Sequence, residues 1–149
     1  MSAYVTAGGG FLLAVLWFDL MFDVQVIGHD GTELPEPVLA SIAAYYARVT
    51  TSARPMNRLI AATMLATLAA IIVELVNGAD PAWAAWASLG LALAPIMLAG
   101  ARTVPAAVRL GTRADDAAVQ SDLARSTLRE HLFCFLAIAA LITVQLAAL

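Results

Sequence analysis

Long apolar runs separated by short polar segments dominate the pattern of this 149-residue chain. Four of these runs reach or approach the length of about 20 residues with which an α-helix crosses a bilayer. The runs cover residues 4–27, 59–76, 83–101 and 132–149. The pattern therefore predicts an all-α fold, an integral membrane bundle of four transmembrane helices that forms one domain over residues 1–149.

Two longer connections, 28–58 and 102–131, join these spans. In the first, apolar residues recur at every third or fourth position from Val38 to Val49, which predicts an amphipathic helix lying against the inner membrane surface. In the second, residues 114–130 contain neither Gly nor Pro. We therefore expect a helix there that continues into the fourth span and extends it into the cytoplasm.

Composition supports the membrane interpretation and excludes two classes of protein. Apolar residues make up 62% of the chain and charged residues 13%, whereas soluble domains average about 45–50% and 25%. An ordinary soluble enzyme is thereby excluded. The net charge of −3 offers no concentrated positive face for phosphates, so no nucleic-acid partner is expected.

All eight basic residues are arginines, and they lie in the two longer connections or at their edges. Because positively charged loop residues stay on the cytoplasmic side, both connections are predicted to be cytoplasmic. The two chain ends and the short turn at 77–82 then face outward, which is an N-out/C-out topology. No basic residue precedes the first run, so we expect no cleaved signal peptide and a multi-pass location in the cell (inner) membrane.

Charged residues inside a span each cost about 2.5–3.5 kcal/mol at mid-bilayer and therefore need a partner. Asp19 and Asp23 are four residues apart and share one helix face. Arginine remains charged and can hold a carboxylate with two hydrogen bonds. We therefore predict an ion-pair network of these aspartates with Arg102 and Arg109, with Arg58 as a further candidate.

The two arginines of this network are expected on an inward seam of the third helix, whose positions alternate by three and four residues. The seam comprises Ser88, Ala92, Pro95, Ala99, Arg102, Ala106 and Arg109. Helical spacing also predicts two polar layers separated by an apolar belt. The cytoplasmic layer contains Asp19, Asp23, Arg102 and His131, and the outer layer contains Glu74, Ser88 and Gln145.

Two interpretations of these polar residues remain open. In the functional one, Asp19, Asp23 and His131 are the catalytic candidates, because an imidazole with an unperturbed pKa of about 6.5 suits a general base. The candidates for binding a substrate are Arg58, Arg102, Arg109 and Glu74. In the structural one, the charges form ion pairs that fix the register of the helices.

No metal site and no cofactor are predicted. His29 and His131 are the only histidines and do not form a ligand pair of metal-binding spacing. Cys134 is the only cysteine, so an internal disulfide is excluded. The glycines at 8–10 lack the lysine of a phosphate-binding loop, and we expect them to permit close helix contact instead.

Three functional classes remain. The first hypothesis is an accessory or interaction subunit of a membrane assembly, since the chain has no complete catalytic set; its partners are the lipid bilayer and another protein or a second copy. The alternative is a membrane-embedded enzyme that acts on a lipophilic substrate through Asp19 or Asp23, with His131 and with Arg102 and Arg109. The third is a proton-coupled carrier that oligomerises.

Overall fold

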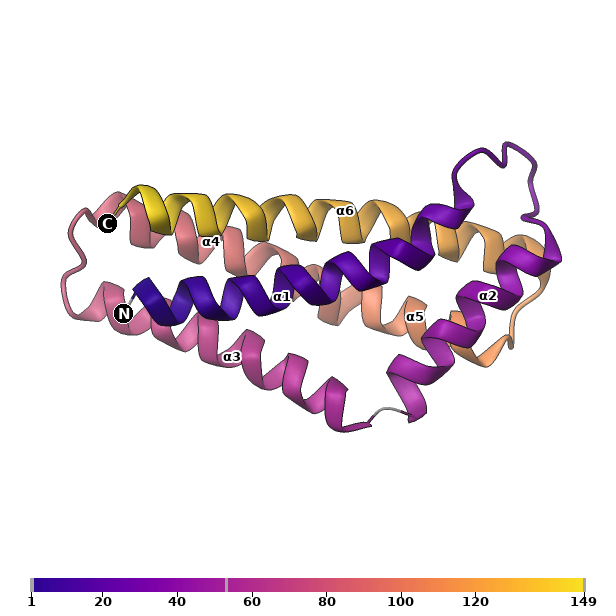
Figure 1. The fold of residues 1–149 in the computed structure, drawn as a ribbon, viewed down its shortest axis with the longest axis horizontal. Helices are drawn as coiled ribbons and strands as arrows, with labels where there is room; N and C mark the ends of the chain where they lie inside the picture. Colours follow the sequence, from indigo (N-terminus) through magenta and orange to yellow (C-terminus); the bar gives the residue numbers. More distant parts are fainter. Residues whose placement is uncertain (1, 53, 149) are drawn as a thin grey trace.

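The computed structural model describes residues 2–52 and 54–148, and within these ranges the chain is helical with no strand (Figure 1). The helices are α1 (Ser2–Asp23), α2 (Glu36–Ala47), α3 (Arg54–Val76), α4 (Ala82–Leu98), α5 (Val104–Thr112) and α6 (Ala117–Ala147). A 3₁₀ turn, Val24–Val26, follows α1, and π turns follow α2 at Arg48–Ser52 and α4 at Ala99–Thr103. The prediction of an all-α fold is confirmed.

Four helical stretches are long and apolar enough to cross a membrane: Ala3–Val26, Pro55–Val76, Ala82–Thr112 and Ala117–Ala147. The predicted number of such helices is confirmed. The last two are longer than the predicted spans, because α4 continues through a π turn into α5, and α6 begins well before residue 132. The expectation of a helix without interruption through residues 114–130 holds from Ala117 onward.

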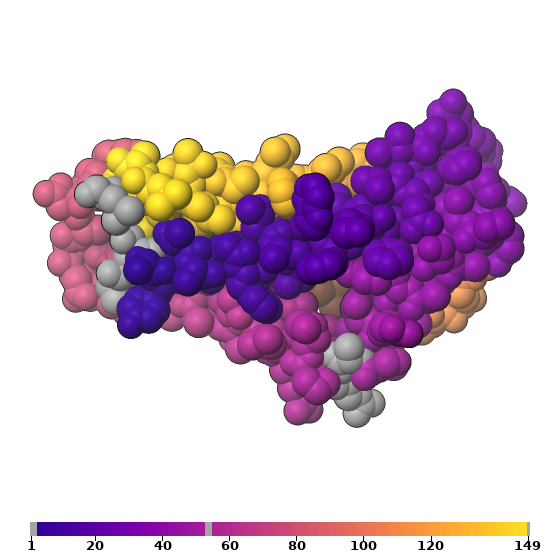
Figure 2. Space-filling view, in the orientation of Figure 1, coloured from indigo at the N-terminus to yellow at the C-terminus, as the bar shows by residue number. Residues whose placement is uncertain are grey.

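The four long helical stretches run along the long axis of the molecule (Figure 1). Both chain ends and the turn at 77–81 lie at one end, which we call the terminal end. The opposite end, which we call the loop end, carries α2, α5 and the loop at 27–35. The two longer connections predicted from the sequence therefore meet at the same end of the bundle, where α2 lies beside the end of α1 (Figure 2).

The predicted helix is present as α2, and its apolar face packs on other helices of the protein. Leu39, Ile42 and Tyr46 are buried, in a core that includes Leu110 of α5. Gly111 permits this packing, because a Cβ atom there would lie 2.7 Å from the backbone nitrogen of Ala47. Contact with α5 thus buries the apolar face of α2, which periodicity alone predicts to lie on a membrane surface.

The loop that leads into α2 is tied to α6. The guanidinium of Arg125 donates hydrogen bonds to three carbonyl oxygens of this loop. The backbone N–H of Leu34 donates to Ser121 Oγ at 2.8 Å, and Arg113 pairs with Glu36 at the start of α2 at 2.8 Å. Contacts with the chain near α6 therefore fix the position from which α2 begins.

The expected close contact at the N-terminal glycines is confirmed for two of them. A Cβ atom on Gly8 would overlap Thr67 Oγ1 of α3, and one on Gly9 would lie 3.0 Å from Ile142 of α6. These glycines let α1 approach both neighbours closely. Gly10 has nothing within 4 Å of the same position, so it faces outward.

Candidate functional site

Five polar side chains from three helices meet at the loop end of the bundle, where α1, α2 and α6 approach one another (Figure 1). They are Asp19 and Asp23 of α1, Tyr45 and Tyr46 of α2, and His131 of α6. We call them the Asp-Tyr-His cluster. The sequence predicted that Asp19, Asp23 and His131 share one layer, and the structure brings these three together.

Asp23 is the most buried member of the cluster, with 1% of its surface exposed. Its Oδ1 accepts a hydrogen bond of 2.6 Å from the hydroxyl of Tyr46. Its Oδ2 lies 2.6 Å from Nδ1 of His131. Both oxygens of this carboxylate therefore have short hydrogen bonds, one to a phenol and one to an imidazole.

Asp19 lies one helical turn earlier and contacts the other side of the imidazole. Its Oδ1 accepts a hydrogen bond of 2.6 Å from the hydroxyl of Tyr45, and its Oδ2 lies 3.8 Å from Nε2 of His131. The spacing of four residues places both carboxylates on the same face of α1. As a result, one imidazole lies between two carboxylates.

The two tyrosines close the cluster on the side of α2. The ring of Tyr45 stacks on Phe22 with a centroid distance of 4.0 Å, and Tyr46 meets Tyr45 edge-on at 5.3 Å. Burial, and then the Asp23 carboxylate, raise the pKa of Tyr46; burial and then Asp19 raise the pKa of Tyr45. Both phenols therefore keep their protons at neutral pH and act as hydrogen-bond donors.

The predicted ion pairs between the aspartates and arginines were wrong. Arg102 lies 3.3 Å from Glu130, and Arg109 pairs with Asp115 at 2.7 Å. Within the described residues, Arg58 is exposed and forms no ion pair with either aspartate. The aspartates of α1 find their partners in two phenols and an imidazole, and none of the arginines whose side chains the structure describes takes part.

The misplacement of Arg102 and Arg109 has a clear structural cause. The first part of the predicted seam is buried as expected, including Ser88, Ala92 and Pro95. Beyond the π turn Ala99–Thr103, the buried positions are Thr103, Ala107 and Leu110, each one residue later than predicted. A π turn holds an extra residue and so shifts the register of everything that follows. It ends two residues before Pro105, whose ring would clash with the carbonyl of residue 101 in a regular α-helix.

Glu130 is a further buried acid that sequence reasoning missed. Its carboxylate accepts hydrogen bonds from Thr103 Oγ1 at 2.8 Å and from Ser126 Oγ at 3.1 Å. Arg102 Nε lies 3.3 Å from the same group, whose side chain is 10% exposed. The signal in the sequence was its place directly before His131, at the edge of the apolar run 132–149.

At the terminal end, the predicted meeting of Glu74, Ser88 and Gln145 is confirmed. Nε2 of Gln145 donates to Ser88 Oγ at 3.0 Å and reaches Glu74 Oε2 at 3.4 Å. We call these three residues the Gln145 group. A pocket of about 290 Å³ borders the group and is also lined by Asp80.

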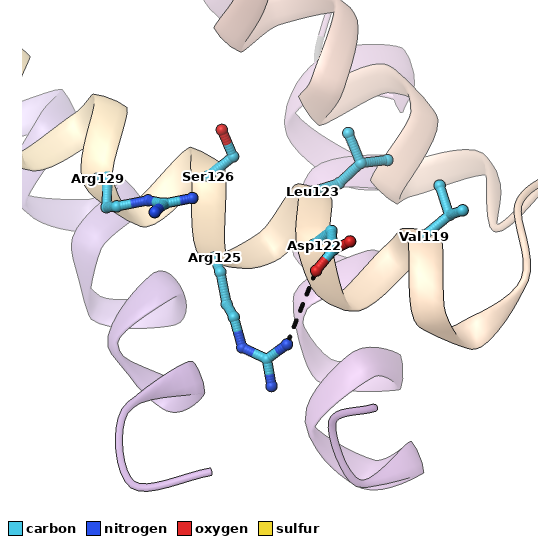
Figure 3. Close-up of a pocket in the computed structure, with 6 residues that line it drawn as sticks. All are labelled: Val119, Asp122, Leu123, Arg125, Ser126 and Arg129. Carbon is cyan, nitrogen blue, oxygen red and sulfur yellow. Dashed lines mark ion pairs between the residues drawn. The ribbon is translucent and has the colours of Figure 1, made fainter. Parts of the chain in front are cut away.

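A larger open pocket of about 640 Å³ lies along the first half of α6 (Figure 3). It is lined by Val119, Asp122, Leu123, Arg125, Ser126 and Arg129. Figure 3 shows Arg125 beside Asp122, an ion pair of 3.9 Å. All six residues belong to one helix, so this pocket is an outer surface of α6 and contains no residue of the Asp-Tyr-His cluster.

Within residues 2–52 and 54–148, no three His, Cys, Asp or Glu side chains are placed so that they could hold a metal ion. Cys134 is a free, buried thiol. Comparison of the chain with protein families, with curated proteins and with solved structures finds no match. The function must therefore be inferred from the geometry of the site.

Proposed function

We propose that this chain is a multi-pass protein of the cell inner membrane that works by binding and releasing a proton at the Asp-Tyr-His cluster. Four helices of sufficient length and hydropathy support insertion in the lipid bilayer. The confinement of the arginines to the longer connections and their edges supports an orientation with both chain ends outside. In that orientation the loop end, with the cluster, is the cytoplasmic end.

The observation that carries the proposal is one imidazole between the buried carboxylate of Asp23 and the partly buried carboxylate of Asp19. With His131 protonated and both aspartates ionised, the net charge of the cluster is −1, and one further proton makes it zero. A buried charge without a partner is costly, because the interior does not solvate it. One proton therefore decides whether the cluster is neutral, and binding that proton changes the energy of the folded state.

Binding of a proton at the cluster should change how α2 is held. Tyr45 and Tyr46 donate to the same carboxylates that share the imidazole, so the strength of these hydrogen bonds depends on where the proton lies. We propose that the proton state of the cluster controls how firmly α2 docks on α1 and α6. Both a proton-coupled carrier and a proton-responsive subunit would use a helix whose docking depends on a bound proton. The enzyme hypothesis loses its substrate-holding arginines, since Arg102 and Arg109 lie elsewhere.

A second candidate function is an accessory or interaction subunit, bound to another protein or to a second copy. Gly10, Gly90 and Gly100 lie on α1, on α4 and in the π turn after α4, and a Cβ atom on any of them would meet nothing within 4 Å. Glycine within a helix costs about 1 kcal/mol relative to alanine, and exposed small residues allow membrane helices to associate closely. Extraction in a mild detergent tests this candidate, because a chain that emerges alone at 15.6 kDa contradicts it.

The proton-binding proposal is tested by infrared spectroscopy of the protein in lipid nanodiscs over a range of pH. We expect a carbonyl band from a protonated carboxyl that Asp19→Asn or Asp23→Asn removes or shifts. Asp30→Asn is the matched control, because it makes the same chemical change at an exposed loop residue. Where an aspartate variant does not fold, His131→Gln replaces it. A band that none of the three cluster variants changes contradicts the proposal.

A further inference from the structure

We propose that the open pocket along the first half of α6 binds the phosphate headgroup of an anionic phospholipid, held mainly by Arg129. The inference rests on the membrane location proposed above and not on the proton chemistry of the Asp-Tyr-His cluster. The pocket has a volume of about 640 Å³, and no residue of that cluster lines it (Figure 3). It is therefore a site that the proton-binding function does not use.

Arg129 is the arginine of this pocket that still has donors to offer. The other one, Arg125, already donates to three carbonyl oxygens of the loop at 27–35 and lies 3.9 Å from Asp122. Arg129 is exposed, and it forms no ion pair or side-chain hydrogen bond within the part of the chain that the structure describes. An arginine stays charged and presents paired donors that match a phosphate. Arg129 can therefore bind an anion that the protein itself does not supply.

A second cation, Arg102, lies at the edge of the pocket. Its Nε is 3.3 Å from Glu130 Oε1, and the hydroxyl of Ser126 donates to the same oxygen at 3.1 Å. Ser126 lines the pocket, so Arg102 is its neighbour. The carboxylate of Glu130 balances the charge of one of the two arginines, Arg102 and Arg129. One positive charge remains in excess, and an anionic headgroup would balance it.

The pocket lies at the depth expected for lipid headgroups. Along α6, the rise of about 1.5 Å per residue places Arg129 about 27 Å from Ala147. Along the stretch Ala82–Thr112, the same rise places Arg102 about 30 Å from Ala82. The hydrocarbon core of a bilayer is about 30 Å thick. With the terminal end at one boundary of this core, two separate helices thus place their arginines at the other boundary, which is the cytoplasmic one in the proposed orientation.

Apolar side chains continue the same face of α6 toward the terminal end. Phe133 and Leu136 follow Arg129 by four and seven residues, so the three share one stripe of the helix. Their exposed fractions are 48% and 66%. An acyl chain attached to a headgroup at Arg129 would lie along this stripe, whereas a free phosphate ion would gain nothing from it. The stripe therefore favours a lipid as the source of the phosphate.

The test is native mass spectrometry of the purified protein in a mild detergent, because bound molecules are then identified by their mass. The probes are phosphatidylglycerol and phosphatidylcholine with the same acyl chains, since the choline group of the second cancels the charge of its phosphate. We expect a complex of one protein with one phosphatidylglycerol. It should be about fivefold or more tighter than the complex with phosphatidylcholine, the effect of one arginine near an anionic lipid.

Arg129→Gln should remove this preference, and Arg129→Lys, which keeps the charge but not the paired donors, should retain part of it. Arg109→Gln is the matched control. It removes the same charge, but Arg109 pairs with Asp115 at 2.7 Å and lies seven residues beyond Arg102, so the preference should not change. Circular dichroism checks that each variant is folded.

Three results would overturn the site. They are equal binding of the two lipids, an equal loss of preference in Arg129→Gln and Arg109→Gln, and displacement of the lipid by a phosphate adduct when ammonium phosphate is added. If Arg129→Gln does not fold, the unmodified protein is titrated with ammonium acetate instead. Salt screens exposed charges, so the preference should fall as the salt concentration rises, and a preference that does not change overturns the site.

The membrane location on which this inference rests fails in a different way. A chain that alkaline carbonate washes from host-cell membranes without detergent overturns that location and the lipid site together. A chain that stays in the membrane but shows no preference for phosphatidylglycerol overturns the lipid site alone.

Discussion

The two polar groups at opposite ends of the bundle join distant parts of the chain by different chemistry. At the loop end, two carboxylates lie on either side of one imidazole and accept two phenolic hydrogen bonds. Both phenolic hydrogen bonds and the contact of Asp23 with His131 are 2.6 Å long, and Asp19 lies 3.8 Å from His131. At the terminal end, the neutral amide of Gln145 donates to Ser88 at 3.0 Å and reaches Glu74 at 3.4 Å. Glu74 is half-buried there and borders a pocket.

This difference shows which group depends on a proton. The amide of Gln145 is neutral at every pH of interest, and its shorter contact, with the hydroxyl of Ser88, joins α6 to α4 through two neutral groups. The Asp-Tyr-His cluster buries at least one net charge unless it binds a further proton. Because burying a charge costs more than burying a neutral amide, substitutions at the loop end should have larger effects than those at the terminal end.

The largest effect is expected for Asp23→Ala. Removing the carboxylate leaves Tyr46 and His131 without their buried partner, and breaking such a pair costs about 3–5 kcal/mol. The measurement is denaturation in mixed micelles, followed by circular dichroism. Glu33→Ala, which removes an exposed acid of the nearby loop, should change the free energy of unfolding by less than about 0.5 kcal/mol. Equal effects of the two variants would show that the cluster is not the sensitive region.

Tyr46→Phe should cost about 1.5–3 kcal/mol, the value of a hydrogen bond to a charged group, with Tyr4→Phe at a 72% exposed residue as control. The loss should depend on pH. Burial, and then Asp23, raise the pKa of Tyr46 above its usual 10.0, so the folded state holds this proton more tightly than the unfolded chain does. Its contribution is complete below about pH 10 and declines above that. A difference between Tyr46→Phe and the unmodified protein that grows above pH 10 would contradict the assignment.

Gly111→Ala should loosen α2 from the cluster at a cost of about 1–3 kcal/mol, the usual effect of overpacking. The added methyl group would lie 2.7 Å from the backbone of Ala47. Gly90→Ala is the matched control, since its Cβ meets nothing within 4 Å, and it should be neutral or stabilise by up to about 1 kcal/mol. The same denaturation experiment measures both, and a neutral Gly111→Ala would indicate that α2 is not tightly docked.

Ser88→Ala should have the smallest effect, about 0.5–1.5 kcal/mol. It removes one acceptor of Gln145, whose amide retains its contact with Glu74. Denaturation of this variant beside Asp23→Ala compares the two ends of the bundle directly. A loss at Ser88 as large as the loss at Asp23 would remove the distinction between a charged and a neutral polar group.

The sequence predicts features that depend on local pattern and misses those that depend on distant contacts. Hydropathy located the four long helices, and regular spacing brought Gln145, Ser88 and Glu74 together correctly, since the helices are regular there. The same spacing failed beyond residue 99, because a π turn shifted the register and moved Arg102 out of the seam. The helix from Val38 to Val49 was predicted from its periodicity, but no local pattern shows that Gly111 lets it dock on α5 or that its tyrosines meet the aspartates of α1.

The most direct test of the central claim is nuclear magnetic resonance of the imidazole of His131. The variant His29→Gln has a single histidine, so ¹⁵N-labelled histidine reports on His131 alone. The account predicts that its ring-nitrogen signals titrate, and that Asp23→Asn in this background moves the midpoint by about one pH unit or more, as expected when a carboxylate at hydrogen-bond distance is neutralised. Identical titrations with and without Asp23→Asn would contradict a shared proton in the Asp-Tyr-His cluster.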